Sequence, residues 1–276
     1  MEVRYSPDPV RLEIMNTCEL RESFLIEDLF KVGEINMAYS DIDRVIVGGV
    51  VPSGKGLKLE AGDELKAEYF AQRRELGVIN IGGSGSIIVD SVVFPTVKLD
   101  ALYISRGSRD IEFMSEKEDD PARYYFISYP AHTSYPTTHA KIADAEPLKL
   151  GSLKESNART IYKYIHPAGI KSCQLVMGCT LLEEGSVWNT MAPHTHERRS
   201  EVYMYFNLPD NAAVFHFIGE PHETRHLVVR DSQVVLSPSW SIHAGAGTTN
   251  YAFVWAMGGE NQDFGDMDGI PINSLE

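Results

Sequence analysis

The chain has 276 residues, of which 43% are hydrophobic, and it carries a formal net charge of -14 with a pI near 5.1. This apolar fraction is sufficient for one large core or for two cores of ordinary domain size. The excess of carboxylates repels phosphate backbones and anionic lipid surfaces, so the composition argues against nucleic-acid binding and membrane binding. An anionic substrate would therefore need a local cluster of Arg and Lys side chains.

Neither a membrane span nor a signal peptide is expected. No apolar run approaches the roughly 18–20 residues that cross a bilayer. The N-terminal stretch MEVRYSPDPVRLEIMN has charges where a signal peptide has an apolar core. The cysteines Cys18, Cys173 and Cys179 form an odd, sparse set without a C-x-x-C spacing, which favours reduced thiols. Together these features predict a cytoplasmic protein.

Short runs rich in Val, Ile, Tyr and Phe recur along the chain between clusters of Gly, Pro, Asn and Asp. Strands at this spacing predict a sandwich or barrel rather than alternating strands and helices. Helices are expected only at Leu20–Leu29 and Asp63–Phe70. The predicted strands lie within residues 44–51, 76–83, 84–94, 100–107, 123–129, 173–182, 201–208, 212–219, 225–231, 233–239 and 251–259.

A connector is expected between His132 and Thr160, where Pro, Ser, Thr and charged residues mix without a sustained period. The sequence therefore predicts an N-terminal β domain over residues 1–145 and a C-terminal β domain over 146–276. The two halves resemble degenerate copies of one unit, since each has a hairpin followed by a strand, a Ser-containing turn and a further strand. Two unrelated β-rich halves are the alternative.

The C-terminal half contains a pattern typical of a metal site. His194 and His196 stand two residues apart, so their side chains share one face of a strand. A turn after His196 would return Glu201 toward the two imidazoles, and His243 follows a Pro-containing turn. Three imidazoles and one carboxylate suit Zn, Fe, Mn, Ni or Co with one or two open positions. At the place of His243 the first half offers only Arg109 and Asp110, so that half is expected to lack metal ligands.

A His-x-His pair alone is often only a polar strand face. The pair, a carboxylate five residues later and a distant third His form a rarer combination, and this order is typical of the cupin barrel. We therefore expect His194, His196, Glu201 and His243 to bind one divalent metal ion.

The strings around these residues make the pattern more specific. HTHERRSEVYMYFN, SPSWSIHAGAGT, ETRHLVV and GGENQDFGDMD closely resemble the 5-keto-4-deoxyuronate isomerases, also called 4-deoxy-L-threo-5-hexosulose-uronate ketol-isomerases. SDIDRVIVGGVVP, RRELGVINIGGSGSIIVD, DALYISRG and PAHTSYPT resemble the N-terminal half of the same family. The resemblance thus spans nearly the whole chain.

The resemblance implies an all-β bicupin, with two cupin-like β-barrel or jelly-roll domains and few short helices. The N-terminal domain would lack metal ligands, and the C-terminal domain would hold Zn²⁺, one per subunit, on the four residues named above. The protein would be a cytoplasmic homo-hexamer. It would interconvert 5-dehydro-4-deoxy-D-glucuronate and 3-deoxy-D-glycero-2,5-hexodiulosonate, a step in pectin and uronate degradation.

Moving a carbonyl between neighbouring carbons requires a Lewis acid and a base that carries a proton between them. Glu201 is the proposed proton carrier, with His226 as another candidate. The substrate carboxylate calls for a cation, and Arg199 and Arg225 lie near the motif in sequence. Tyr203 shares the predicted face of Glu201 and could contact substrate oxygens. Two other functions stay open: a metal-dependent cupin dioxygenase and a non-catalytic bicupin that binds a sugar acid.

Overall fold

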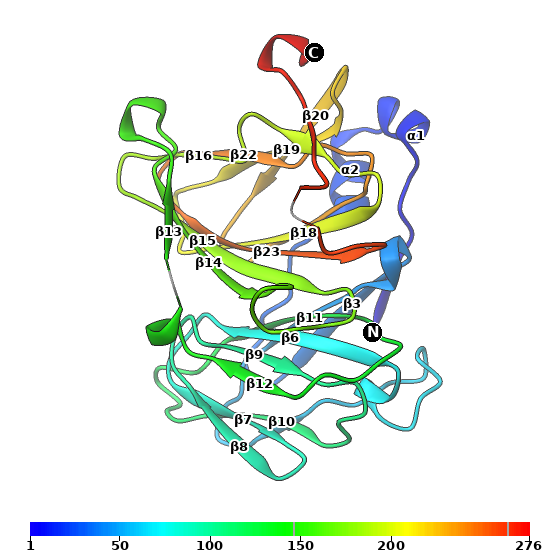
Figure 1. Cartoon of the computed structure of the whole chain (residues 1–276), viewed down its shortest axis with the longest axis vertical. Helices are drawn as coiled ribbons and strands as arrows, with labels where there is room; N and C mark the ends of the chain where they lie inside the picture. Colours follow the sequence, from blue (N-terminus) through cyan, green and yellow to red (C-terminus); the bar gives the residue numbers. More distant parts are fainter. Residues whose placement is uncertain (146, 264) are drawn as a thin grey trace. The chain divides into compact units, whose positions relative to one another are not determined.

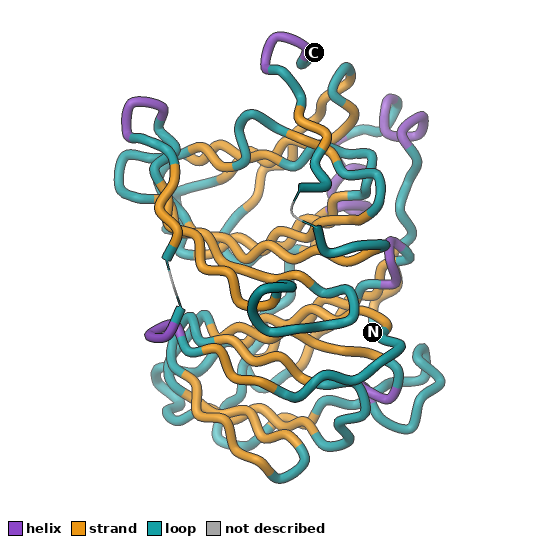
Figure 2. Tube along the Cα trace, in the orientation of Figure 1, coloured by secondary structure: helices purple, strands orange, loops and turns teal. Residues whose placement is uncertain are grey.

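The structure is a computed structural model that describes residues 1–145, 147–263 and 265–276. Strands dominate the chain and helical segments are few and short (Figure 2), which confirms the all-β prediction. The chain folds into two compact units. None of the described helices is long and apolar enough to span a membrane.

Two sheets make up the strands of the first unit. The seven-stranded sheet has the order β1 (Glu2–Arg4), β3 (Ile35–Ser40), β4 (Ile46–Val50), β11 (Tyr124–Pro130), β6 (Arg74–Asn80), β9 (Ala101–Ile104), β12 (Thr138–Ala140). The four-stranded sheet has the order β5 (Leu57–Lys58), β10 (Ile111–Ser115), β7 (Gly85–Val89), β8 (Val92–Thr96).

Large apolar side chains fill the interior of this first unit. Phe70, Phe113, Phe126 and Tyr124 are fully buried within one core cluster, and the ring centroids of Phe70 and Phe126 lie 5.8 Å apart. Burial of aromatic rings is a large favourable contribution to folding. The interior of the first unit is therefore a packed apolar core.

The second unit is built in the same way. Its seven-stranded sheet has the order β13 (Leu148–Leu150), β14 (Arg159–Ile165), β15 (Val176–Leu182), β23 (Ala252–Gly259), β18 (Arg199–Phe206), β21 (Val234–Ser237), β2 (Leu25–Ile26). A four-stranded sheet has the order β16 (Trp188–Asn189), β22 (Ala244–Gly247), β19 (Val214–Glu220), β20 (Glu223–Val229). Figure 1 shows these two layers of the second unit, and β17 (His194–Thr195) pairs separately with β24 (Asp268–Gly269).

The two units repeat one pattern of strand pairing. β6 and β18 each stand fifth in a seven-stranded sheet, and both pair antiparallel with the next strand in that order. Leu76 is opposite Ile104 at the end of one such pair, and Glu201 is opposite Ser237 at the end of the other. Leu76 of the first unit therefore occupies the register position of Glu201, which supports the internal duplication expected from the sequence.

The helical segments are short. The α-helices are α1 (Pro9–Glu13) and α2 (Thr17–Phe24), and the 3-10 helices are Ile42–Arg44, Phe70–Gln72, Ile142–Asp144, Leu153–Glu155 and Ile272–Ser274. Asn16 and Glu19 form a capping box at the start of α2, since each side chain accepts a hydrogen bond from the backbone of the other. The helix expected at Leu20–Leu29 exists, but it begins earlier and ends at Phe24, where the chain becomes the extended strand β2.

The prediction of a helix at Asp63–Phe70 is wrong. This segment forms turns, and a single 3-10 turn begins only at Phe70. Lys66 has φ of 45°, and Gly62 just before the segment has φ of 69°. A right-handed helix cannot continue through residues in the left-handed region, so the apolar spacing here does not produce a helix.

The two units are not contiguous in sequence. The first comprises Met1–Arg4, Asp28–Ala145 and Tyr164–Val176, and the second comprises Tyr5–Glu27, Glu146–Lys163 and Met177–Glu276. The predicted domains 1–145 and 146–276 thus differ from the units in two segments. Residues 5–27 belong to the second unit because β2 extends its large sheet beside β21, and residues 164–176 belong to the first.

Candidate metal centre

Four side chains from three parts of the second unit meet at one point. His194 opens β17 and His196 follows that strand directly, so the two imidazoles come from the same short extended piece. Glu201 lies on β18, and His243 immediately precedes β22 of the other sheet. Their nearest ligand atoms all lie within 4.8 Å of one another. The structure therefore gathers the four side chains that the sequence pattern selected.

The nitrogen and oxygen atoms of these side chains face one another. Nε2 of His243 lies 3.0 Å from Nε2 of His194 and 2.9 Å from Oε2 of Glu201. Nε2 of His196 lies 3.2 Å from the same carboxylate oxygen, yet it is buried and has no hydrogen-bond partner of adequate geometry. Converging imidazole nitrogens, one of them buried without a hydrogen bond, fit a cation that accepts their lone pairs.

Burial and charge set the protonation states of the cluster. Burial lowers the pKa of His194 to about 3 and that of His196 to about 4, although the negative charge of Glu201 acts in the opposite direction. Burial alone would raise the pKa of Glu201, but the charge and hydrogen bond of His243, with the charges of His196 and His194, lower it to about 2. At neutral pH the site thus has two neutral imidazoles and one carboxylate, which are the forms that bind divalent cations.

Two adjacent arginines follow His196 and behave differently. Arg199 is buried, and its Nε donates a hydrogen bond to Nδ1 of His196 over 3.1 Å, while its Nη1 is buried without a partner. Arg198 is half-buried and forms ion pairs with Asp266 and Asp268. Arg199 is therefore part of the site, whereas Arg198 ties β18 to the segment that carries β24.

The cluster opens into a cavity of about 330 Å³, which is large enough for a small organic acid. All residues that line it belong to the second unit. They are Leu148, Leu150, Arg159, Ile161, Lys163, Thr180, Thr190, Met191, Ala192, His194, His196, Arg199, Glu201, Tyr203, Phe253, Trp255, Met257 and Met267. The cavity wall thus combines polar atoms of the His and Glu cluster, apolar side chains and additional cations.

The KduI/IolB family model matches residues 26–268 of this chain. The chain belongs to the KduI/IolB family. A protein of Halalkalibacterium halodurans is 54% identical over 275 residues, and one of Caldicellulosiruptor bescii is 52% identical over 276 residues. Each match covers 100% of this chain and 100% of the relative, and both relatives are named 4-deoxy-L-threo-5-hexosulose-uronate ketol-isomerase. These findings confirm the family that the sequence strings indicate.

Solved structures show the same fold at low sequence identity. An IolB-like protein from Salmonella typhimurium LT2 aligns with a TM-score of 0.73 and 13% identity, covering 90% of this chain and 97% of that one. A variant of Bacillus subtilis oxalate decarboxylase aligns with a TM-score of 0.56 and 10% identity, covering 83% of this chain and 71% of that one. These likenesses show that the fold of this chain also occurs in an IolB-like protein and in an oxalate decarboxylase.

Of the other residues that the sequence predicted for substrate binding and proton transfer, some line the cavity and some do not. Arg199 and Tyr203 line the cavity, and the Tyr203 hydroxyl lies 2.9 Å from the Thr190 hydroxyl. Arg225 does not line it, because it lies on β20, where it pairs with Glu223 and donates to the carbonyl of Glu13. His226, the alternative base, is exposed on the same strand with its ring against Phe215.

Several residues near the cluster escaped the sequence-based prediction. Arg159 and Lys163 reach the cavity from β14, far from the histidine motif in sequence. His216 is fully buried beneath the cluster; its Nδ1 lies 2.7 Å from the Tyr205 hydroxyl, and burial lowers its pKa to about 3. The alternation of Arg159 and Lys163 along a strand is the only sequence signal that could have suggested a shared face.

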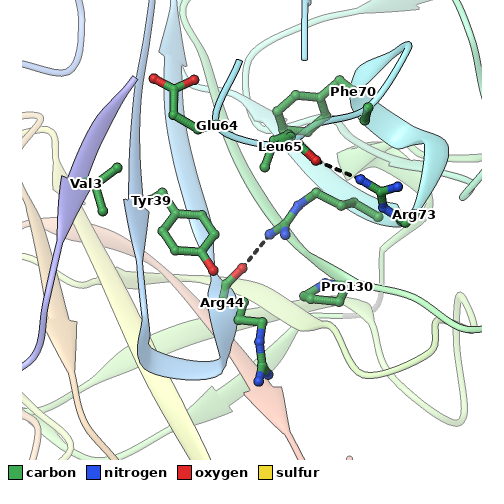
Figure 3. A pocket seen from close by; sticks show the side chains of 10 residues that line it. Val3, Tyr39, Arg44, Glu64, Leu65, Phe70, Arg73 and Pro130 are labelled. Carbon is green, nitrogen blue, oxygen red and sulfur yellow. Dashed lines mark hydrogen bonds between the residues drawn. The ribbon is translucent and has the colours of Figure 1, made fainter. Parts of the chain in front are cut away.

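The first unit has a cavity of its own, of about 450 Å³ (Figure 3). Arg74, at the register position of Arg199, extends toward it but donates hydrogen bonds to the carbonyls of Arg44 and Ser128. Arg73 donates to the carbonyl of Leu65 in the same way. These guanidinium groups hold backbone carbonyls, so their contacts explain their presence without a ligand.

Proposed function

We propose that this protein is a metal-dependent aldose–ketose isomerase that interconverts 5-dehydro-4-deoxy-D-glucuronate and 3-deoxy-D-glycero-2,5-hexodiulosonate in pectin and uronate degradation. The observation that carries the proposal is the complete cluster of three histidines and Glu201 at a cavity, in a chain whose full-length relatives are named as this ketol-isomerase. A small sugar acid also fits the size of the cavity and its mixture of apolar and cationic walls.

The proposed metal ligands are His194, His196, Glu201 and His243. The cation is proposed to be Zn²⁺, one per subunit, although this donor set suits other divalent metals as well. When bound, such a cation supplies Lewis acidity that stabilises negative charge developing on a substrate carbonyl oxygen. Support for the ligand set comes from the converging nitrogen atoms and from the buried, unpartnered Nε2 of His196.

Side chains of the chain itself would position the sugar and move its proton. Glu201 is ionised and lines the cavity, so its carboxylate is the proposed carrier of the proton between the two reacting carbons. Burial and the nearby Glu201 charge hold the pKa of Tyr203 well above its ordinary value. The Tyr203 phenol is therefore neutral and can donate a hydrogen bond to a substrate oxygen.

A cytoplasmic homo-hexamer is the proposed form of the protein. This part of the proposal rests on the resemblance of the sequence to the ketol-isomerases. Size measurement by light scattering would test it, since a hexamer has six times the 30.8 kDa mass of the chain.

The function is tested by one assay on two proteins. Isomerisation of the deoxyuronate is measured for the wild type and for His243→Ala, with metal content determined in both. We expect full activity in the metal-loaded wild type and a loss of both metal and activity in the variant. Activity retained by a metal-free His243→Ala protein would overturn the proposed mechanism.

Two further outcomes would replace the proposed function. Bound iron with consumption of oxygen would identify a dioxygenase. Tight binding of the deoxyuronate without conversion, by protein with full metal content, would identify a sugar-acid-binding protein.

A further inference from the structure

Cationic side chains line the cavity of the second unit on the side of β14. Arg159, Ile161 and Lys163 alternate along this strand, and all three line the cavity because alternate residues share one face. The chain has a net charge of -14, so two cations at one cavity face run against its overall charge. Local positive charge of this kind favours an anionic ligand.

The guanidinium of Arg159 has capacity for such a ligand. It is half-buried, and Nη1 donates one hydrogen bond, to the carbonyl of Asn157 over 2.9 Å. Within the described part of the chain, no carboxylate lies within 4.0 Å of its nitrogens. Tyr203 lines the same cavity from β18. Arg159 thus lines the cavity with donors that the carboxylates of the described residues do not occupy.

Arg159 and the metal cluster lie on opposite parts of the cavity wall. Two strands, β15 and β23, separate β14 from β18 in the sheet, and neighbouring strands lie about 4.8 Å apart. Thr180 and Trp255 line the cavity from these two strands, and Trp255 donates from Nε1 to the Thr180 hydroxyl over 3.1 Å. A ligand that spans the cavity would therefore have its polar groups at its two ends and an apolar wall between them.

The proposed substrate has this distribution of groups. The reacting carbonyl of the deoxyuronate is at one end of its carbon chain, and its carboxylate group is at the other end. We propose that Arg159, assisted by the charge of Lys163, binds the substrate carboxylate and makes the enzyme specific for uronates; this inference rests on the proposed function. A guanidinium suits the role because it can donate two parallel hydrogen bonds to one carboxylate.

Arg199 is less suited to this role, although it is closer to the histidines in sequence. Its Nε lies 3.1 Å from Nδ1 of His196, so it adjoins the end of the cavity where the carbonyl reacts. A carboxylate held there would place the far end of the substrate against the metal ligands. Arg199 instead contacts His196, one of the proposed metal ligands.

The test compares two substrates, the deoxyuronate and its neutral analogue in which the carboxylate is reduced to a hydroxymethyl group. For Arg159→Gln we expect kcat/KM on the uronate to fall about 10- to 100-fold, mainly through KM, as for the loss of a charge-assisted hydrogen bond. Its kcat/KM on the neutral analogue should equal that of the wild type. Arg159→Lys should recover part of the loss. Equal losses on both substrates, or no loss, would overturn the proposal.

Two controls make the test specific. Lys149→Gln removes a charge from an exposed residue of β13 that does not line the cavity, and it should leave both activities unchanged. Metal content and melting temperature should be equal in the wild type and in Arg159→Gln. If both substrates lose activity in Lys149→Gln as well, net charge explains the effect and the proposal fails.

A binding measurement separates this inference from the proposed function. A metal-loaded wild type that does not isomerise the deoxyuronate refutes the function, and calorimetry with D-glucuronate then decides the role of Arg159. Binding at least tenfold weaker in Arg159→Gln than in the wild type supports the inference. Equal binding in both proteins, or no binding by the wild type, overturns it.

Discussion

Nε of Arg199 donates a hydrogen bond to Nδ1 of His196 over 3.1 Å. A neutral imidazole has one proton, so a ring that accepts at Nδ1 has its proton on Nε2. The cluster, however, gathers the Nε2 side of this ring toward Glu201. A metal bound at Nε2 needs the lone pair there, so metal binding requires the proton to leave Nε2. The Arg199 hydrogen bond therefore favours the metal-free state of His196.

We expect Arg199→Met to bind divalent metal about tenfold more tightly than the wild type, or about 1.4 kcal/mol. The variant removes both the hydrogen bond that holds the proton on Nε2 and a positive charge beside the site. Competition with a chromophoric chelator measures the affinity. Arg198→Met, which removes an equal charge from a neighbour that is paired with Asp266 and Asp268, should change the affinity much less. A weaker affinity in Arg199→Met would show that Arg199 supports the metal-bound state.

His216 gives a prediction for stability against pH. Burial lowers its pKa in the folded protein to about 3, whereas an unfolded His has a pKa near 6.5. Between these values the unfolded state binds one proton more, so His216 makes the free energy of unfolding fall by about 1.4 kcal/mol per pH unit as pH decreases. Between pH 6 and about 4, the free energy of unfolding of His216→Gln should therefore fall less steeply than that of the wild type, by about 1.4 kcal/mol per pH unit.

Urea unfolding of chelator-treated protein across this pH range measures the slope for both proteins. The variant also loses the contact with Tyr205, which lowers its stability at every pH without changing the slope. Parallel curves for the two proteins would mean that His216 is not kept neutral by burial.

Glu75 gives a prediction for the first unit. Its buried carboxylate accepts hydrogen bonds from the Tyr103 hydroxyl at 2.8 Å and from the backbone N–H groups of Cys173, Gln174 and Leu175 at 2.7 to 3.0 Å. Glu75→Gln replaces one accepting oxygen by an NH₂ group. At least one of the N–H or O–H groups that donate to Glu75 would then face another donor and lose its hydrogen bond. We expect a loss of about 3 kcal/mol in the free energy of unfolding, as for a buried charged acceptor.

Urea denaturation measures this loss, and Glu116→Gln serves as the matched exposed control, with an expected change under about 0.5 kcal/mol. A comparably small change in Glu75→Gln would show that segment 173–175 is held mainly by other contacts.

The fold and the four clustered side chains were predictable from the sequence because their signals are local. Strand alternation and turn residues are encoded within a few positions, and His194 with His196 forms a pair on one strand. His243 is distant from this pair in sequence, but its position after a Pro-containing turn identified it as the third imidazole of the cluster. The strand pairing of the second unit gathers all four side chains, as the pattern predicted.

The rest of the cavity depends on the order of strands in the sheet, which sequence neighbours do not encode. Arg225 is close to the motif in sequence, yet its strand lies in the four-stranded sheet and its charge is paired with Glu223. Arg159 precedes the motif by a long interval, yet β14 belongs to the sheet that contains Glu201. Closeness in sequence therefore selected Arg199, which lines the cavity, together with Arg225, which does not, and it missed Arg159.

The pairing of β2 with β21 has a consequence for how the protein is made. Leu25 lies opposite Val235, so one edge of the sheet that contains Glu201 comes from the N-terminal part of the chain. During synthesis this strand leaves the ribosome long before its partner exists. β2 can pair only after β21 has been synthesised. A chain divided near residue 145 would separate β2 from the rest of the second unit, so we do not expect the two halves to fold independently. A C-terminal fragment would display an unpaired strand, open to association with other chains.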